Sequence, residues 1–391
     1  MANFERYLEK VRELTETIFI PLEAQMEAEG DVPEPAMQAI RDSGLFAISI
    51  PEAYGGLAFT QEQQVRLTFE FTYASSVYRS IFSTTIGLCS QAILDFGSDE
   101  QRRHYLPRMA AGECIGAFCL TEPEAGTDAA SLQTTAVMDG GDYVINGEKR
   151  YITNASIADV LVVMARTNSD VAGSGGISAI LVDPETPGVT ITRMDKLLGQ
   201  RGTVVNEITF TDCRVPVTNL VGDKEGLGLR AALRGINHAR THVAATSVGQ
   251  AMRILDETAS YAREREQFGQ PIGEFGAIQS MLAQSYAEIE AARCMVLEAA
   301  RAFDEGVISG RLPTTQIAAA KYYASEMVTR VADSAVQVLG GKGFVEDNII
   351  TQFFRDTRLF RLFEGTSQIQ ERNIARAVLG DPQPSRAMRN S

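Results

Sequence analysis

The sequence predicts a mainly α protein with a central β domain, and three observations support this fold class. Apolar residues have helical spacing over most of the first 115 residues. Short β-type runs separated by turn residues then extend to about Leu220. From Gly226 onward, long alanine-rich amphipathic segments have the pattern of a helical bundle. We therefore predict an N-terminal helical domain, a middle β domain and a C-terminal four-helix bundle, over residues 1–115, 116–225 and 226–391.

The N-terminal region contains one charge in an unusual setting. Its apolar spacing predicts helices over residues 11–28, 35–42, 61–97 (one or two) and 99–111, with a loop over 51–56. Arg79 is the only charged residue between Glu70 and Asp95. A buried guanidinium needs an anion, because an uncompensated buried charge is strongly destabilising. That anion is either an acid elsewhere in the fold or the carboxylate of a bound molecule.

The middle region has the pattern of an antiparallel barrel or sandwich. Seven runs have β-type composition, over residues 115–120, 132–138, 143–145, 160–165, 177–182, 189–193 and 204–210. Asn146-Gly147 is a strong hairpin-turn signal. The C-terminal region instead predicts long helices over residues 229–264, 278–305, 313–339 and 368–379, whose alanines allow close helix packing.

Composition and charge exclude several functional classes. The net charge of −14 disfavours nucleic acid and anionic membranes as partners. Five cysteines without a C-x-x-C pair indicate reduced thiols and a cytoplasmic protein. His238 and His242 stand four apart but lack a third ligand, so we expect no metal site. The most apolar long run contains Arg79 and reads as a buried helix, so we expect no membrane span.

Glu364 is a candidate general base. It stands between Phe363 and Gly365, and Thr366 can cap a following helix. A carboxylate on a tight turn against apolar side chains loses hydration, which raises its pKa and makes it a better proton acceptor at neutral pH. The alternative is a solvated glutamate in a helix-initiating loop.

Two stretches of the middle region suit a flavin. Residues 118–128 end a strand with hydroxyls and glycine, which can contact a planar polar ring and a phosphate. In residues 149–155, Tyr151 precedes Thr153 by two positions and offers an aromatic face beside a hydroxyl. Ordinary strand-end loops are the alternative. Gly226 to Ala231 also matches a dinucleotide fingerprint, but it opens no βαβ unit.

Taken in order, these motifs resemble the acyl-CoA dehydrogenase family across essentially the whole chain. The resemblance rests on residues 51–56, 120–128, 151–154, 214–216, 265–269, 337–344, 355–356 and 363–368. It implies a homotetramer that binds FAD. By this likeness the FAD-binding residues are Phe118, Leu120, Thr121, Thr127, Tyr151, Thr153, Thr366 and Gln368, with Arg265, Phe268, Gln337, Gly340 and Gly341 from a neighbouring subunit. Most relatives have Trp where this chain has Tyr151, and Gln where it has Gly276.

The resemblance also implies the chemistry. Glu364 corresponds to the family's catalytic base, which removes the α-proton of an acyl-CoA thioester while the β-hydrogen leaves as hydride to the flavin. Its backbone N–H would bind the thioester oxygen. Thr127, Arg240 and Gly365 would line the substrate site, and an electron-transfer flavoprotein would accept the electrons.

Arg79 narrows the substrate class. Residues 76–80 together with 237–240 resemble the glutaryl-CoA dehydrogenase branch, in which this arginine holds the distal carboxylate. Decarboxylating members tend to have Glu and Tyr where this chain has Thr72 and Phe363. Glutaryl and other short ω-acid thioesters are therefore equal alternatives. Glu364 argues against a 3-sulfinopropionyl-CoA desulfinase-like enzyme and against a flavin monooxygenase on this fold; a catalytically silent CoA-ester binder is a further alternative.

Overall fold

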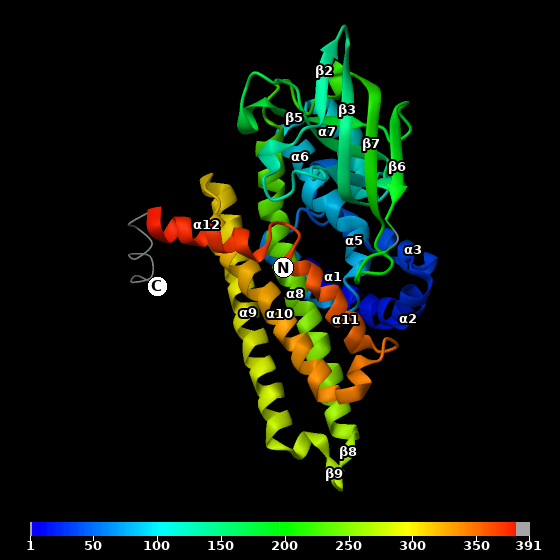
Figure 1. Ribbon diagram of the computed structural model, residues 1–391, viewed down its shortest axis with the longest axis vertical. Helices are drawn as coiled ribbons and strands as arrows, with labels where there is room; N and C mark the ends of the chain where they lie inside the picture. The colour runs from blue at the N-terminus through cyan, green and yellow to red at the C-terminus, as the bar shows by residue number, and fades with distance from the viewer. Residues whose placement is uncertain (1, 195, 381–391) are drawn as a thin grey trace.

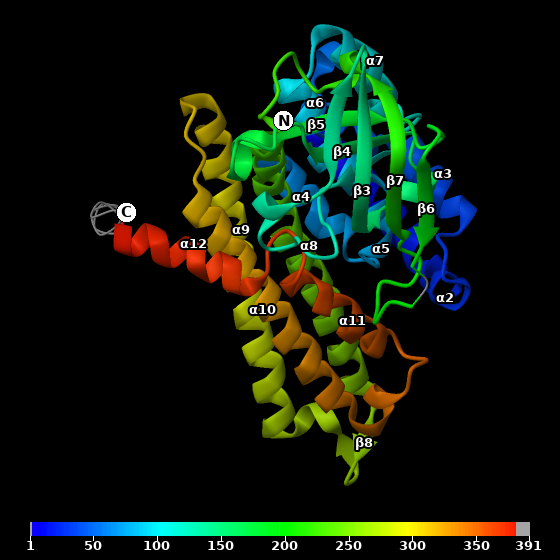
Figure 2. The same cartoon turned by 45° about the horizontal axis from the view of Figure 1, so that its top comes forward.

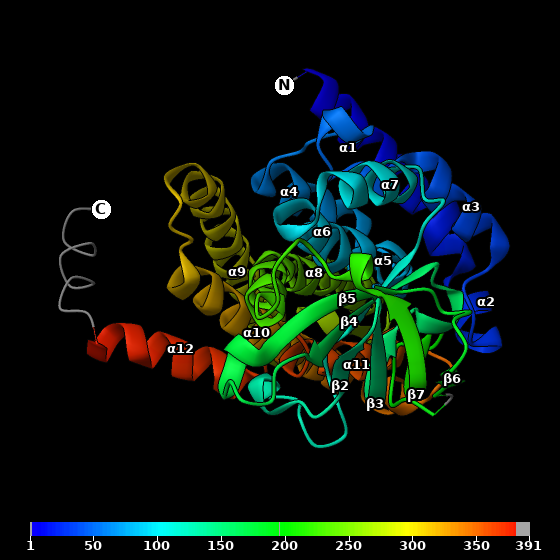
Figure 3. The same ribbon diagram turned by 90° about the horizontal axis from the view of Figure 1, so that it is seen from above.

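The protein is mostly helical and is built around one β-sheet, as the computed structural model shows for residues 2–194 and 196–380 (Figure 1). The predicted fold class is confirmed. The last residues of the predicted third domain, 381–391, lie outside the described residues. The N-terminal helices pack beside the sheet (Figure 3), while the long C-terminal helices run away from it to the far end of the molecule (Figure 1).

The N-terminal region forms seven α-helices joined by short turns. They are α1 (Ala2–Leu14), α2 (Ile20–Glu29), α3 (Glu34–Ser43), α4 (Gln61–Phe71), α5 (Val77–Thr84), α6 (Ser90–Phe96) and α7 (Asp99–Ala110), with π-helical turns η1 (Thr15–Phe19) and η4 (Thr85–Cys89). Thr60 and Ser98 cap α4 and α7 through capping boxes. The predicted loop over residues 51–56 contains the 3₁₀ turn η3 (Glu52–Tyr54).

The predicted helical stretch over residues 61–97 is interrupted at 72–76, and distant side chains stabilise the interruption. The Ser75 N–H donates to Glu23 Oε1 at 2.7 Å. Gln250 Nε2 donates to the Thr72 and Ala74 carbonyls at 2.6 and 2.7 Å. Gly249 makes this approach possible, because a Cβ there would lie 2.3 Å from Thr72 Oγ1. These contacts satisfy the backbone groups that leave the helix and fix the start of α5, which carries Arg79.

All seven predicted strands are present in one mixed sheet. They are β1 (Gly116–Cys119), β2 (Thr135–Asp139), β3 (Asp142–Thr153), β4 (Val160–Arg166), β5 (Ile177–Val182), β6 (Val189–Arg193) and β7 (Val205–Pro216). The order is β1-β4-β2-β3-β7-β6, and β5 pairs with β4. The β1–β4 and β2–β4 pairings are parallel, so the sheet is not entirely antiparallel as predicted.

The hairpin turn predicted at Asn146-Gly147 is wrong. This dipeptide lies inside β3, where the register against β7 shifts between Ile145 and Gly147. Gly147 has φ +147°, and a Cβ there would lie 2.6 Å from Thr134 Oγ1. The glycine therefore permits a bulge and a close approach. The tight turn instead follows Asp139 and leads from β2 into β3.

The C-terminal region is dominated by three long helices. Its elements are α8 (Gly228–Glu264), β8 (Glu266–Gln267), β9 (Gln270–Pro271), α9 (Gly276–Ser309), α10 (Thr314–Leu339), η10 (Gly340–Phe344), α11 (Ile349–Thr357), η11 (Arg358–Arg361) and α12 (Ser367–Gly380). Alanines and valines of α8, α9 and α10 form the shared core. The unpredicted α11 packs on α8 and α10, whereas α12 contacts α10 and projects sideways (Figure 2). No helix of the described residues is long and apolar enough to cross a bilayer.

Candidate active site

Glu364 and Gly365 form a left-handed turn between η11 and α12 (Figure 2). Glu364 has φ +52° and Gly365 has φ +89°. A Cβ at Gly365 would lie 2.8 Å from Gln370 Nε2 and 3.1 Å from Arg240 Nη2, so the position requires glycine. The predicted helix cap is present, because the Ile369 N–H donates to Thr366 Oγ1 at 3.4 Å. A non-glycine residue in this conformation persists only when its surroundings hold it.

Three side chains hold the two carbonyl groups of this turn. Arg240 Nε donates to the Glu364 carbonyl at 2.9 Å. Gln370 Nε2 donates to the Glu364 and Gly365 carbonyls at 3.2 and 3.0 Å. Lys321 Nζ donates to the Gly365 carbonyl at 2.8 Å. The turn is thus tied to α8, α10 and α12. Sequence reasoning missed Lys321 and Gln370.

The charges of three cations act on the Glu364 carboxyl group, although none of them forms an ion pair with it among the described residues. Burial raises its pKa, while Arg240, Arg79 and Lys321 act in the opposite direction. Burial also lowers the pKa of Arg79 to about 10 and that of Lys321 to about 8, and it lowers the pKa of Arg240. Desolvation has the larger effect on Glu364, so the net pKa is raised, as the sequence predicted. Glu364 is half-buried, so the alternative of a fully solvated glutamate does not fit.

Arg79 has no structural counter-ion. Within residues 2–194 and 196–380, no carboxylate forms an ion pair with its guanidinium, and its side chain makes no hydrogen bond. Glu364 is the acid whose charge acts on it. The first of the two readings, a salt bridge to an acid elsewhere in the fold, is therefore not found in the described structure.

A buried histidine pair lies near Arg79. The His238 and His242 rings are 4.8 Å apart. His242 is bonded to Thr68 Oγ1 at 3.2 Å and to Gln64 Oε1 at 3.1 Å. Burial, with Arg79 adding to it, lowers the pKa of His238 to about 4, so the pair is neutral at neutral pH. No group of metal ligands occurs among the described residues.

The two stretches predicted to bind flavin lie side by side. The Arg150 N–H donates to the Thr121 carbonyl at 2.8 Å, and Lys149 Nζ donates to the Leu120 carbonyl at 3.2 Å. The ends of β1 and β3 therefore meet. Tyr151 has φ +57° and is 58% exposed, with the Arg150 guanidinium 5.3 Å from its ring centroid. Its ring is available for stacking.

A buried ion pair that sequence reasoning missed supports these stretches. Lys149 Nζ lies 2.7 Å from Glu122 Oε1, and both side chains are at least 95% buried. Glu122 also accepts hydrogen bonds from the Gln133 and Thr134 N–H groups at 2.6 and 3.0 Å. Burial alone would raise the pKa of Glu122, but Lys149 and these donors outweigh it and the net pKa is lowered. The pair fixes both ends of the loop that carries Thr127.

These residues fit the isoalloxazine half of FAD. Phe118 is buried near the end of β1. The hydroxyls of Thr121, Thr127 and Thr153 form no hydrogen bond with any described residue, so they are available to a ligand. Tyr151 in the second stretch also has a positive φ, as Glu364 has on its turn, and such strain persists where the surroundings hold it.

Five of the remaining predicted FAD residues form a second group at the far end of the bundle. Phe268 lies in the turn between β8 and β9, has φ +53° and is 95% exposed (Figure 1). Arg265 precedes this hairpin, and Gln337, Gly340 and Gly341 end α10 nearby. Thr366 and Gln368 lie instead beside Glu364, at the start of α12. Within one chain, the predicted FAD residues near Glu364 and those at the far end of the bundle are therefore not brought together. Their roles stay predictions.

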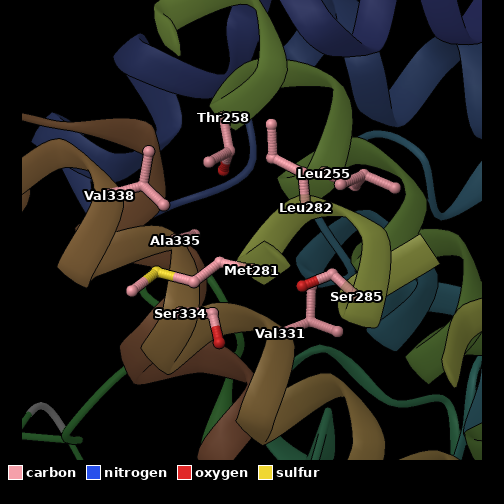
Figure 4. A pocket seen from close by; sticks show the side chains of 9 residues that line it. All are labelled: Leu255, Thr258, Met281, Leu282, Ser285, Val331, Ser334, Ala335 and Val338. Carbon is pink, nitrogen blue, oxygen red and sulfur yellow. The ribbon is translucent and has the colours of Figure 1, made fainter. Parts of the chain in front are cut away.

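The pocket enclosed by the bundle does not belong to this site. It holds about 10 Å³, which is room for about one water molecule. Figure 4 shows that it is lined by Leu255, Thr258, Met281, Leu282, Ser285, Val331, Ser334, Ala335 and Val338. None of these residues contacts Glu364, so an acyl chain would have to bind elsewhere.

Comparisons with known proteins agree with this geometry. The chain matches the acyl-CoA dehydrogenase N-terminal domain over residues 3–113, the middle domain over 117–213 and the C-terminal domain over 226–379. It is 35% identical to the glutaryl-CoA dehydrogenase of Desulfococcus multivorans, over 95% of each chain.

Two solved structures are also similar. One is a glutaryl-coenzyme A dehydrogenase in complex with glutaryl-CoA, with a TM-score of 0.92, 34% identity, and coverage of 97% of this chain and 96% of the other. The second comes from work on the electron transferring flavoprotein of Acidaminococcus fermentans. It has the same TM-score and identity, and it covers 97% of this chain and 99% of the other.

Proposed function

Because the chain belongs to the acyl-CoA dehydrogenase family, we propose that it oxidises the Cα–Cβ bond of a short acyl-CoA thioester that carries a distal carboxylate. It is an FAD-dependent oxidoreductase that acts on the CH–CH group of an acyl-CoA. When bound, FAD takes up the hydride that leaves Cβ. The substrate's acyl group and the roles of individual residues are the proposed part.

Glu364 is proposed to accept the α-proton on its carboxylate. The raised pKa matches a general base that works near neutral pH. The left-handed turn presents the side chain, and Arg240, Gln370 and Lys321 keep the turn in place. The Glu364 N–H forms no hydrogen bond with the described residues, so it is free to donate to the thioester oxygen as negative charge develops there.

The observation that carries the substrate proposal is the unpaired Arg79 guanidinium beside Glu364. A charged group in a largely dry pocket gains most from an opposite charge, and a distal carboxylate supplies one. The charges of Arg79 and Glu364 act on one another, which supports a short acid such as glutaryl or succinyl as the acyl group. The likeness to glutaryl-CoA dehydrogenases supports the same class.

We further propose that the distal carboxylate is retained. Thr72 is fully buried and its hydroxyl donates to the Thr68 carbonyl at 2.6 Å, so it offers no acid at the position where decarboxylating relatives tend to have Glu. Phe363 packs against Phe360, with ring centroids 5.9 Å apart, and supplies no phenol before the base. Both positions lack the polar group that decarboxylating members place there.

The proposed partners follow from the family and the fold. We propose an electron-transfer flavoprotein as electron acceptor, which the likeness to the structure from work on such a flavoprotein supports. A homotetramer is supported by the separation of the two predicted FAD groups within one chain. All five cysteines are free, which supports a reducing compartment such as the cytoplasm.

The substrate proposal is tested with Arg79→Met. Anaerobic bleaching of the flavin is measured with glutaryl-, succinyl- and butyryl-CoA, and the product mass shows whether the carboxylate remains. Truncating one partner of a desolvated charge pair costs roughly 2–5 kcal/mol, so kcat/KM for the dicarboxyl thioesters falls about 30-fold to several thousandfold. Butyryl-CoA is oxidised as well as before or better, because no cation is left unpaired.

The matched control is Arg66→Met, which removes an arginine from the neighbouring α4 and breaks the exposed pair with Glu5. It leaves both substrate classes unchanged. Equal loss of both classes in Arg79→Met contradicts the proposed carboxylate contact. Binding of every thioester without bleaching would instead identify a silent CoA-ester binder.

A further inference from the structure

Lys321 is a fully buried lysine in an otherwise apolar part of α10. Its relative exposure is 0%, and it follows the alanines at 318–320. Lysine is almost never fully buried without a partner, because the ammonium group loses its hydration. Some interaction inside the protein must therefore offset that loss.

The interactions of Lys321 all lead to the Glu364 turn. Its Nζ donates to the Gly365 carbonyl at 2.8 Å, which is its one side-chain hydrogen bond within the described part of the chain. It forms no ion pair there. Glu326, one turn further along α10, is occupied instead by Arg361 at 2.8 Å and by the Ser367 hydroxyl at 2.5 Å. The carboxylate whose charge acts most strongly on Lys321 is that of Glu364.

Lys321 and Arg240 act on successive peptide groups of the same turn. Arg240 Nε holds the Glu364 carbonyl from α8, whereas Lys321 Nζ holds the Gly365 carbonyl from α10. A glycine at φ +89° has many other conformations open to it, so a single fixed conformation needs such contacts. Loss of either contact frees one side of the turn that carries the proposed base.

We propose that Lys321 is a positioning residue for Glu364. It holds the Gly365 carbonyl so that the left-handed turn presents the carboxylate to the substrate, and its positive charge stabilises the ionised form of that carboxylate. This inference rests on the proposed function, since it assigns Lys321 a part in the work of the proposed base.

Two pH effects follow. The charged groups that face Lys321 are Glu364 on the turn, Arg240 on α8 and Glu326 on α10. Removing the lysine charge raises the pKa of Glu364, because one of three opposing cations is gone. Deprotonation of Lys321 near pH 8 weakens its bond to Gly365. A higher pKa makes a stronger base, but a displacement of about 1 Å costs up to about 100-fold and is the larger effect.

The test compares Lys321→Met with Arg330→Met in the FAD-loaded enzyme. Both variants remove one cation from α10, but Arg330 is half-exposed and pairs with Glu288 on α9. Stopped-flow flavin reduction by a saturating acyl-CoA is measured from pH 5 to 10. In Lys321→Met the maximal rate constant of flavin reduction falls about 10- to 100-fold, which is roughly 1.4–2.7 kcal/mol. The acid limb of its pH–rate profile moves to higher pH. Arg330→Met keeps the wild-type rate constant and the wild-type pH–rate profile.

Further measurements separate positioning from folding. Lys321→Arg, which keeps a charged donor, recovers part of the rate, and thermal unfolding shows whether the variants are intact. If Lys321→Met does not fold, the wild-type enzyme supplies the test: its rate constant falls in a one-proton step near pH 8, and thermal unfolding at each pH shows that the enzyme stays folded across that step. A wild-type rate that is flat to pH 10, or an unshifted acid limb in folded Lys321→Met, overturns the inference. The proposed function fails separately, if Glu364→Gln still reduces the flavin.

Discussion

At the scale of single residues, the site depends on opposing effects on one carboxyl group. Burial raises the pKa of Glu364, and three cations hold that rise in check. A substrate carboxylate bound at Arg79 would neutralise one of the three. The pKa of Glu364 would then rise further when the correct substrate is present, which strengthens the base at the moment it is needed. In the proposed function, the unpaired arginine would thus link substrate recognition to proton removal.

The role of Glu364 is tested by Glu364→Gln. The amide keeps the size of the side chain but cannot take up the α-proton. We expect the variant to fold and to bind FAD, while flavin reduction by an acyl-CoA falls by about 10³-fold or more, the upper part of the range for general base catalysis. Glu371→Gln, on the exposed face of α12, serves as the control and keeps the wild-type rate. More than a tenth of the wild-type rate in Glu364→Gln would contradict the assignment.

At the scale of elements, the sequence predicted which segments form helices and strands. It did not predict where these elements are interrupted. Periodicity indicated the long C-terminal helices and all seven strands. The break at residues 72–76 depends on Glu23 and Gln250, which are far away in the sequence, so no local pattern could indicate it. Gly147 was misread for the same reason, since its bulge is explained by the close approach of Thr134.

Prediction of the candidate site from the sequence was limited in the same way, because contacts between distant residues cannot be read from a local pattern. Glu364, Arg79 and Tyr151 were found because a charge or an aromatic residue stands out against its neighbours or matches a motif. Lys321 stands out equally among alanines, and that signal was available but unused. The Glu122–Lys149 contact joins two motifs that were identified separately, and the fold alone reveals that they touch.

That ion pair gives an element-scale prediction, tested with Lys149→Met, Glu122→Gln and the double variant. Removing one partner leaves an uncompensated buried charge and costs roughly 3–5 kcal/mol of unfolding free energy. Because the pair joins the ends of β1 and β3, we expect FAD affinity to fall as well. The double variant recovers part of the stability, since neither charge remains.

Stability is followed by denaturant unfolding and FAD affinity by fluorescence titration. The control is Arg214→Met in the same sheet, which breaks half-exposed contacts with Asp139 and Asp142. Pairs of this kind contribute about 0–1 kcal/mol. If Lys149→Met changes stability and FAD affinity no more than this control, the pair does not support the cofactor site.

At the scale of the whole molecule, the predicted FAD residues are divided between two ends of the bundle. Lys321 and Gln337 lie sixteen positions apart on α10, or about 24 Å along a helix. The turn with Glu364 is beside the first of them, and the exposed hairpin with Phe268 is near the second. The order of motifs along the chain could not indicate this separation. We therefore predict that a complete FAD site needs a second copy of the chain.

Mixing two inactive variants tests that requirement. Glu364→Gln lacks the base but keeps an intact far end, whereas an Arg265→Ala/Phe268→Ala variant keeps the base and loses the far-end contacts. Phe268 is 95% exposed within one chain, so its truncation leaves the fold of the chain intact. We expect the double variant alone to bind FAD at least about tenfold more weakly, the loss of roughly one charge-assisted contact. All assays therefore use a limiting FAD concentration that loads the wild type but leaves the double variant mostly without cofactor and so inactive. Ile308→Ala, at an equally exposed apolar residue at the other end of α9, binds FAD normally.

When the two inactive proteins are dissociated, mixed, reassembled and supplied with FAD, half of the mixed sites combine the intact Glu364 of one chain with the intact Arg265 and Phe268 of the other. Acyl-CoA-dependent flavin reduction then reappears, although neither parent has it. Size-exclusion chromatography with light scattering confirms that mixed oligomers have formed. If they form and remain inactive, each chain builds its FAD site alone, and the division of the site between subunits is wrong.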